Sequence, residues 1–195
     1  MAQDYTQLNG DAEAIAAVKA LYAEHDELPY ISPKRDIAAY LEKIQVTSGQ
    51  TVPKRNMVRL EEDVLPGHII ILWRVRFGTY TNQTVISKYF EYDYGIDAKS
   101  DIEILIDRGY VREMSAKESL IYLTAQMLKK WLKEKGVKGY SKFSKEELMD
   151  AVREQFTEEE LAEKYEERGY ALTDSGEDLL DKHPEVIDRH PKKKY

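Results

Sequence analysis

Two apolar stripes between Met127 and Val152 constrain the fold of this chain more than any other feature. In each stripe, apolar residues recur three and four positions apart, which places them on one face of a helix. The stripes are Leu128, Trp131 and Leu132, and then Leu148, Met149 and Val152. Gly136 follows the first stripe, where helices commonly end in a left-handed residue, and Ser144 with Glu147 has the spacing of a capping box before the second. The sequence therefore predicts a helix, a short extended turn and a second helix.

The residues of this predicted turn resemble two known helical modules. Residues 136–148, GVKGYSKFSKEEL, are similar to the small N-terminal helical subdomain of the transcription terminator Rho. They resemble more loosely the SAP motif, a helix-extended-helix module that binds DNA, although the turn is longer and lacks the SAP glycine before the lysine. The matching positions are Leu128, Leu132, Gly136, Val137, Gly139, Tyr140, Ser141, Lys142, Lys145 and Leu148. The resemblance implies nucleic-acid binding.

The charge of the same region fits a surface that contacts phosphates. Residues 117–152 hold eight basic and five acidic side chains, a local charge of +3 in a chain whose net charge is −7. Lysines that neutralise phosphates release counterions, which favours binding. The residues expected at this surface are Lys129, Lys130, Lys133, Lys138, Gly139, Tyr140, Ser141, Lys142 and Lys145. A helix face whose lysines are merely solvated is the alternative.

Each residue type at this surface has an expected role. The lysines would contact phosphates, while Gly139 and Ser141 would donate hydrogen bonds at the turn. The start of the second helix, beside that turn, would also favour an anion. Tyr140 could stack on a base, as aromatic residues do in proteins that bind single strands.

Residues 1–112 predict a helical, winged-helix-like domain. After a polar tail, one amphipathic helix begins at Asp11 and ends near Pro29. A second begins at Ser32-Pro33 and ends before the polar loop 47–53. The apolar run that follows Pro66 fits either a buried strand or a helix, and a proline at the first helical position favours the helix.

The second half of this domain has the element order of a winged helix-turn-helix. Thr81 or Asn82 can cap a helix over residues 85–90, and Asp97 or Ser100 can cap a helix that ends at Gly109. A strand-like segment, 110–112, comes next. The second of these helices carries a net charge of −2 where a DNA-reading helix would meet phosphates. We therefore expect a protein-contacting or structural role for it.

The C-terminal part of the chain is strongly acidic. Residues 153–181 hold three basic and eleven acidic side chains, and Thr157 with Glu160 forms a predicted capping box. A solvated helix face explains this charge, but the surface could also repel nucleic acid, dock on the basic module or bind a protein partner. The tail ends in the basic cluster 192–194, which could add one electrostatic contact.

Two patterns connect distant parts of the sequence. Arg108-Gly109-Tyr110 recurs as Arg168-Gly169-Tyr170, each expected to mark a helix end, an extended segment and a new helix cap, through duplication or chance. The order Tyr89-Phe90, Tyr94-Gly95-Ile96, Gly109-Tyr110, Leu123-Thr124 and Tyr170-Ala171-Leu172-Thr173 is similar to that of phage-associated proteins with winged or SAP modules. That resemblance implies a phage or mobile-element setting.

Composition and missing motifs exclude several classes of protein. The chain has no cysteine, so thiolate zinc sites and disulfides are ruled out, and no apolar run or N-terminal leader indicates a membrane. The motifs GxxxxGK[ST], GxGxxG, GxSxG and HExxH are absent. A further alternative is a metal-dependent nuclease built from Glu61, Glu62 and Asp63 with Asp97 and Lys99. We expect a cytoplasmic protein that is not an enzyme and has no cofactor or metal.

These observations combine into one prediction of fold and function. The fold class is α+β, mainly α: a winged-helix-like domain at 1–112, a SAP- or Rho-N-like helical module at 113–155, and an acidic helix-strand-helix region at 156–195. The function is non-enzymatic nucleic-acid binding, with DNA favoured over RNA. The alternative is a protein-interaction or structural adaptor in which the module only packs. The arrangement of Lys138, Lys142 and Lys145 distinguishes the two functions. Nucleic-acid binding requires the three lysines on one exposed face, whereas scattered lysines or ion pairs with Glu146 and Glu154 would weaken that prediction.

Overall fold

The computed structural model describes residues 4–46 and 51–191, and this part of the chain is mainly helical. It contains eleven α-helices, three short 3-10 helices and a two-stranded sheet, which confirms the coarse prediction of a mainly α-helical α+β protein. The predicted N-terminal tail and the loop 47–53 lie partly outside the described residues, and the basic cluster 192–194 lies wholly outside them.

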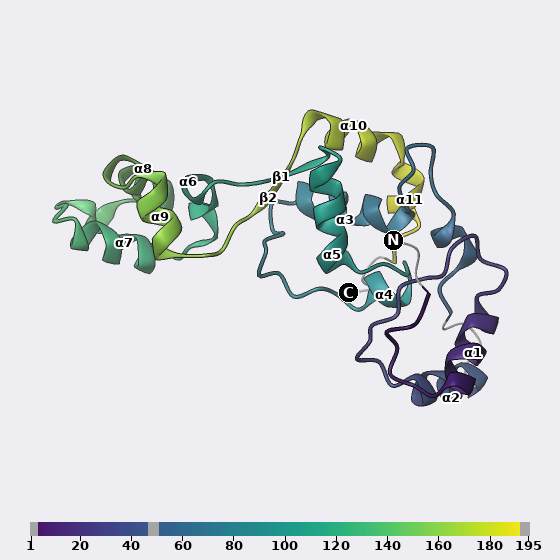
Figure 1. The fold of residues 1–195 in the computed structure, drawn as a ribbon. Helices are drawn as coiled ribbons and strands as arrows, with labels where there is room; N and C mark the ends of the chain where they lie inside the picture. The colour runs from purple at the N-terminus through teal and green to yellow at the C-terminus, as the bar shows by residue number, and fades with distance from the viewer. Residues whose placement is uncertain (1–3, 47–50, 192–195) are drawn as a thin grey trace. The chain divides into compact units, whose positions relative to one another are not determined.

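The order of the elements can be followed in Figure 1. The α-helices are α1 (Ala12–Leu21), α2 (Ile37–Val46), α3 (Pro66–Arg76), α4 (Tyr89–Tyr92), α5 (Ala98–Asp107), α6 (Ala116–Ser119), α7 (Ala125–Glu134), α8 (Lys145–Gln155), α9 (Glu158–Lys164), α10 (Asp174–Lys182) and α11 (Pro184–Asp188). The strands are β1 (Val111–Glu113) and β2 (Tyr170–Leu172), and the 3-10 helices are η1 (Lys54–Met57), η2 (Leu120–Tyr122) and η3 (Tyr140–Lys142).

The described residues form two compact units that interleave along the sequence. Unit 1 comprises those of Met1–Arg74, Val85–Val111 and Leu172–Tyr195, and unit 2 comprises Val75–Thr84 and Arg112–Ala171. The segments 1–112, 113–155 and 156–195 remain a prediction of domain boundaries, and the units divide the chain at different positions.

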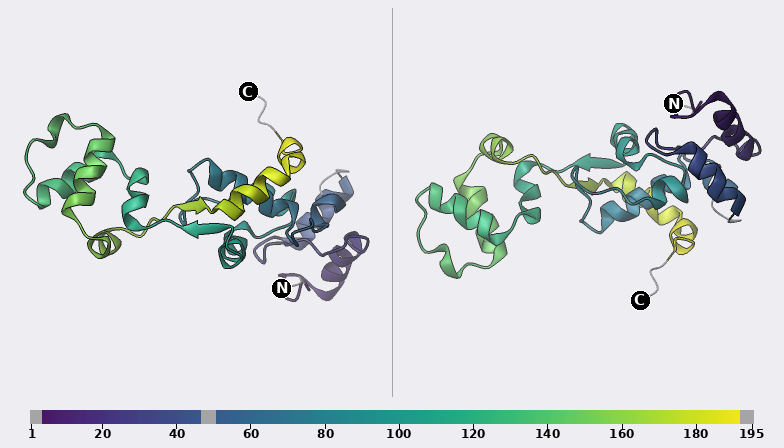
Figure 2. Two further views of the ribbon diagram at one scale, coloured as in Figure 1. Left: turned by 90° about the horizontal axis from the view of Figure 1, so that it is seen from above. Right: turned by 90° about the horizontal axis from the view of Figure 1, so that it is seen from below.

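The small sheet lies where the chain passes between the units. The amide of Met114 donates to the carbonyl of Gly169 at 2.8 Å, and the amide of Thr173 donates to the carbonyl of Tyr110 at 3.1 Å, so β1 and β2 run antiparallel. Both views of Figure 2 show the teal β1 and the yellow-green β2 side by side. Thr81 extends this pairing through an antiparallel bridge with Gly169.

The two copies of the Arg-Gly-Tyr pattern lie at opposite ends of this antiparallel pair, where Tyr110 faces Thr173 and Gly169 faces Met114, and they differ locally. Gly109 has a φ of +75° and follows α5, as predicted, and Ser115 then caps α6. Gly169 does not follow a helix end, because α9 already stops at Lys164, and Thr173 caps α10. The prediction of a helix end at the second copy is wrong.

Helix α3 forms the buried centre of unit 1. The prediction that the apolar run after Pro66 is a helix is confirmed, with Pro66 as its first residue. Four consecutive side chains of α3 are fully buried, and these are Ile69, Ile70, Ile71 and Leu72. A helix that buries all sides of a turn belongs in a protein interior, which explains why its sequence lacks an amphipathic pattern.

Three predicted helix boundaries are wrong, and at two of them a tertiary contact decides the local structure. Helix α1 begins after Asp11 as expected but ends at Leu21, where the buried Tyr22 hydrogen-bonds to the hydroxyl of Tyr40. Helix α2 begins at Ile37, capped by Asp36, whose carboxylate accepts from the amide of Ala39 at 3.0 Å. Thr81 and Asn82 cap no helix, since both pair with residues near β2, and only α4 forms in the segment 85–92.

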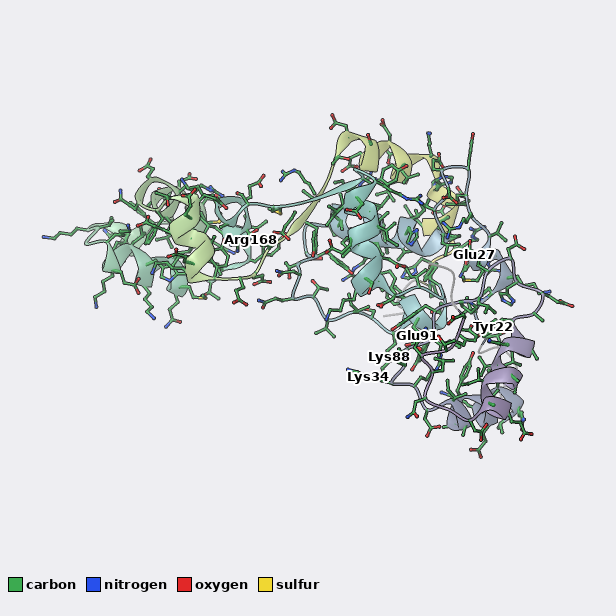
Figure 3. All side chains as sticks on the ribbon, viewed as in Figure 1. Tyr22, Glu27, Lys34, Lys88, Glu91 and Arg168 are labelled. Atoms are coloured by element: carbon green, nitrogen blue, oxygen red, sulfur yellow. The ribbon has the colours of Figure 1, made fainter. Side chains whose placement is uncertain are left out.

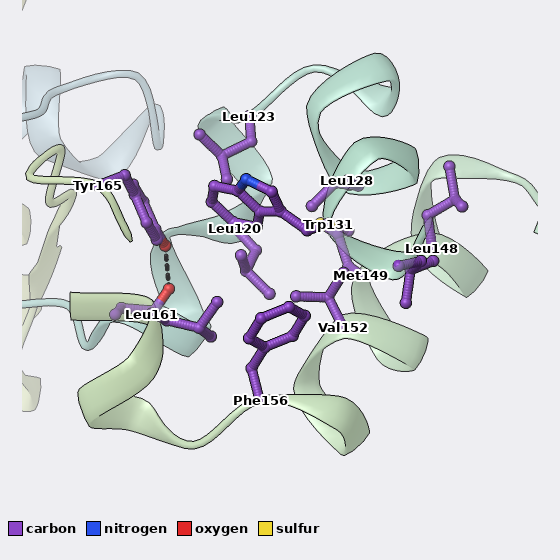
Figure 4. Packing of buried hydrophobic residues seen from close by; sticks show 12 residues of the cluster. Leu120, Leu123, Leu128, Trp131, Leu148, Met149, Val152, Phe156, Leu161 and Tyr165 are labelled. Atoms are coloured by element: carbon purple, nitrogen blue, oxygen red, sulfur yellow. Dashed lines mark hydrogen bonds between the residues drawn. The ribbon is translucent and has the colours of Figure 1, made fainter. Parts of the chain in front are cut away.

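The core of unit 2 is built by α6, α7, α8 and α9. Its largest side chain is Trp131, whose ring lies 6.3 Å from that of Phe156 and 5.5 Å from that of Tyr165 (Figure 4). The hydroxyl of Tyr165 donates to the carbonyl oxygen of Ala116 and so links α9 to α6. The other buried members are Leu120, Leu123, Leu128, Leu132, Leu148, Met149, Val152 and Leu161.

The predicted helix pair is present as α7 and α8, which pack against each other in this core. Ser144 and Glu147 form the predicted capping box of α8. The connection differs from the extended turn expected, because left-handed Gly139, with a φ of +85°, leads into the 3-10 helix η3. Phe143 and Ser144, which follow η3, have an extended backbone.

Candidate nucleic-acid interface

The lysines of α7 lie on its solvent side. Leu128, Trp131 and Leu132 are buried, and Lys129, Lys130 and Lys133 project from the opposite half of the helix, because residues three and four apart share a face. Thr124 caps α7 by accepting from the amide of Met127 at 3.3 Å, which fixes where the helix begins. Nitrogen-tipped side chains extend away from the helices in this part of the chain (Figure 3).

Two of the predicted lysines hold the module together. The Nζ of Lys129 donates to the carbonyl of Ser141 at 3.1 Å and places the turn against the lysine side of α7. The Nζ of Lys145 donates to the carbonyl of Ile121 at 2.6 Å and ties the start of α8 to the end of η2. The partners of both lysines are carbonyl oxygens and not carboxylates.

The other predicted lysines, Lys130, Lys133, Lys138 and Lys142, are exposed. Within residues 4–46 and 51–191, none of the four side chains makes a hydrogen bond or an ion pair, and neither Glu146 nor Glu154 pairs with Lys138, Lys142 or Lys145. We call the six side chains Lys129, Lys130, Lys133, Lys138, Lys142 and Lys145 the lysine face.

The turn offers fewer anion-binding groups than the sequence suggested. A carboxylate oxygen of Glu147 accepts from the amide of Ser144 at 2.7 Å, so the chain's own acid occupies the first turn of α8 where an anion was expected. Gly139 and Ser141 are exposed, but the carbonyl of Ser141 is engaged by Lys129. Tyr140 is half-buried and packs against the core of unit 2.

Acidic residues of α7 and α9 pair with lysines outside the lysine face. Lys135 contacts Glu160 at 2.6 Å and Lys164 contacts Glu134 at 2.7 Å, and both ammonium groups lie over the ring of Phe156. The hydrogen bond from Lys135 lowers the pKa of Glu160, and the one from Lys164 lowers the pKa of Glu134. Part of the acidic C-terminal region therefore braces α9 against α7.

Three carboxylates of the nuclease hypothesis are engaged in other contacts. Asp63 pairs with Arg108 at 3.1 Å, and Glu62 contacts His183 at 2.8 Å, which lowers the pKa of Glu62 to about 2. Asp97 accepts from the hydroxyl of Ser100 at the start of α5. No group of three or more His, Asp or Glu side chains that could hold a metal ion occurs among the residues that the structure describes.

A hollow in unit 2 was not anticipated from the sequence. Its volume is about 430 Å³, and its lining residues are Gly78, Thr79, Thr81, Gln83, Thr84, Ile121, Tyr122 and Glu167. They come from three segments that the sequence does not connect by any motif, so only the folded chain reveals the site.

The fold and this site define a mainly α-helical protein with a two-stranded antiparallel sheet and a lysine-bearing helix pair. Comparisons with protein-family models, curated proteins and solved structures give no significant match. Among the described residues, no helix is both long enough and apolar enough to cross a membrane.

Proposed function

We propose that this protein binds nucleic acid through the lysine face of unit 2, without acting as an enzyme, and with DNA favoured over RNA. One observation carries the proposal: Lys130, Lys133, Lys138 and Lys142 are exposed and form no ion pair within the described residues, although the chain is acidic as a whole. Unpaired lysines on one short helical module are the expected footprint of phosphate binding.

The helix pair also supports a SAP-like or Rho-N-like interpretation of this module. Helix α7 ends before left-handed Gly136, and the capped α8 follows after a short connection. Because Lys129 and Lys145 hold that connection through backbone carbonyls, the exposed lysines are presented on a braced scaffold. The phage or mobile-element setting rests on the resemblance of the sequence alone.

We further propose a winged-helix-like arrangement in which the lysine-bearing module is inserted between the wing strands. Two observations support this interpretation. The elements follow one another in the order α3, the segment at Thr81, α4, α5, β1 and β2, and Thr81 forms a bridge with Gly169. In such folds α5 would be the recognition helix, but its exposed face includes Glu103 and Asp107. Those charges disfavour phosphate contacts, and we assign α5 a structural or protein-contacting role.

The competing function is a protein-interaction or structural adaptor. Its support is that Lys129 and Lys145 already serve as internal ties, and that Met127 and Phe143 leave apolar surface exposed on the same module. An adaptor of this kind would not need the four unpaired lysines.

Fluorescence anisotropy tests the proposal directly. Labelled duplex DNA, single-stranded DNA and RNA would be titrated with the protein at about 50 and 200 mM salt, the range over which phosphate contacts weaken strongly. We expect salt-sensitive binding to at least one of them. The proposal fails if none binds even at the lower salt concentration, and the adaptor function would then be pursued.

A further inference from the structure

The hollow in unit 2 has the size of a ligand site and fixed walls. Its volume of about 430 Å³ falls within the range of roughly 300–1,000 Å³ typical of small-molecule pockets. The hydroxyl of Thr81 donates to Glu167 at 3.0 Å, and the hydroxyl oxygen of Thr84 accepts from the amide of Thr81 at 2.8 Å. The first bond joins the segment 78–84 to Glu167, just before β2, and the second fixes a turn within that segment.

One wall of the hollow, the ring of Tyr122, is fixed by close packing against Gly169. A Cβ atom at Gly169 would lie 2.4 Å from the ring of Tyr122, so the ring rests directly on the backbone. The amide of Gly169 also donates to the hydroxyl of Ser119 at 3.1 Å. Tyr122 is therefore held in place as one wall of the hollow.

The lining combines apolar surface with hydrogen-bonding groups and lacks a positive charge. Tyr122 and Ile121 supply an aromatic ring and an aliphatic side chain. The side chains of Thr79 and Gln83 are exposed and form no hydrogen bond with the described residues, and Glu167 adds a carboxylate. Such a lining repels phosphate but suits a planar ring with amino and carbonyl groups on its edge.

A direct contact connects this hollow with the lysine face. Ile121, which lines the hollow, accepts a hydrogen bond from Lys145 at 2.6 Å through its carbonyl oxygen. Lys142 lies on the connection that leads into Lys145. A strand whose phosphates meet these lysines would therefore pass beside the hollow.

We propose that the hollow receives an unpaired nucleobase of a single-stranded nucleic acid whose phosphates lie on the lysine face. This inference rests on the proposed function and specifies its ligand. Bases of a duplex are paired and stacked, whereas bases of a single strand turn outward to stack on protein side chains and form hydrogen bonds. Tyr122 and Ile121 contact the base, and Gln83 and Thr79 bind its edge.

The test compares two labelled single strands of about 16 nucleotides that carry the same phosphates, one with bases and one abasic. Because stacking contributes about 1–3 kcal/mol per base, the protein should bind the strand with bases at least about 5-fold more tightly. In the variant Gln83→Ala with Thr79→Ala, the absence of the two hydrogen-bonding side chains should reduce that preference by about 5-fold, with abasic binding unchanged.

The matched control is Gln155→Ala, which removes an exposed glutamine at the end of α8, away from the lining of the hollow. It should keep the full preference for bases. Equal, salt-sensitive binding of the two strands would overturn the inference and leave the proposed function intact, as would an unchanged preference in the double variant. Absence of binding to both strands at low salt would overturn the two together.

Discussion

Replacing four lysines by glutamine separates phosphate binding from the internal ties of the module. The variant carries Lys130→Gln, Lys133→Gln, Lys138→Gln and Lys142→Gln, which are lysines of the lysine face whose exposed side chains make no hydrogen bond or ion pair in the described part of the chain. Lys129 and Lys145 stay, because their bonds to Ser141 and Ile121 hold the connection. Surface changes of this kind alter stability by less than about 0.5 kcal/mol, so the variant should fold.

The magnitude follows from the number of phosphates that the variant no longer neutralises. Each neutralised phosphate contributes about 0.9 to the slope of log K against log salt for duplex DNA and about 0.7 for a single strand. Four phosphates therefore give a slope decrease of up to about 3.6 for a duplex and about 2.8 for a single strand. Between 50 and 200 mM salt, the duplex value corresponds to a change in affinity of about 150-fold.

The assay is the anisotropy titration repeated at several salt concentrations, with a control of equal charge. Lys19→Gln, Lys34→Gln, Lys88→Gln and Lys99→Gln remove four exposed lysines of unit 1, two of which are labelled in Figure 3. Both variants change the net charge from −7 to −11. If the two variants lower the slope equally, only overall charge matters, and the assignment of the lysine face is refuted.

Two further predictions concern stability. Gly169→Ala should lower the free energy of unfolding by about 1–3 kcal/mol, because its Cβ would meet the ring of Tyr122 at 2.4 Å. Gly136 has a φ of +74° and open space around it, so Gly136→Ala should lower the free energy of unfolding by about 1 kcal/mol through backbone strain alone. Urea denaturation measures both variants, and a larger loss for Gly136→Ala than for Gly169→Ala would contradict this explanation. The hydrogen bond from His183 lowers the pKa of Glu62 to about 2 in the folded protein, whereas the pKa in the unfolded chain is about 4.3. The ionised carboxylate therefore stabilises the fold fully above about pH 4.3. This contribution is lost as the pH falls toward 2. The difference in unfolding free energy between the wild type and Glu62→Gln should therefore be larger at pH 6 than at pH 3, and a constant difference would speak against the predicted role.

Much of the local structure was predictable because it depends on residues close together in the sequence. The Ser144 and Glu147 capping box, the helix start at Asp11 and the start of α3 at Pro66 are each confirmed. A capping bond joins residues two or three positions apart, so the sequence carries its whole signal. Two of the wrong boundaries lie where a distant partner intervenes, as Tyr40 does at the end of α1.

The candidate site was predictable only in part. The sequence located the lysines and the helix pair, since apolar spacing determines which side of α7 is buried. It did not reveal that Lys129 and Lys145 serve as ties, or that Glu147 fills the first turn of α8. Those roles depend on where each flexible side chain finds a partner after packing.

The sequence by itself determined the mainly helical class, the position of the lysine-bearing module and its local positive charge. Only the tertiary structure decided that β1 pairs with β2, which lysines remain unpaired, and that the segment 78–84 meets Glu167 to form a hollow. Thr81 and Glu167 are 86 positions apart, and neither residue carries a local signal of the other. Helices and caps follow from interactions within a few residues, whereas the walls of a site are set by packing among segments that the sequence keeps far apart.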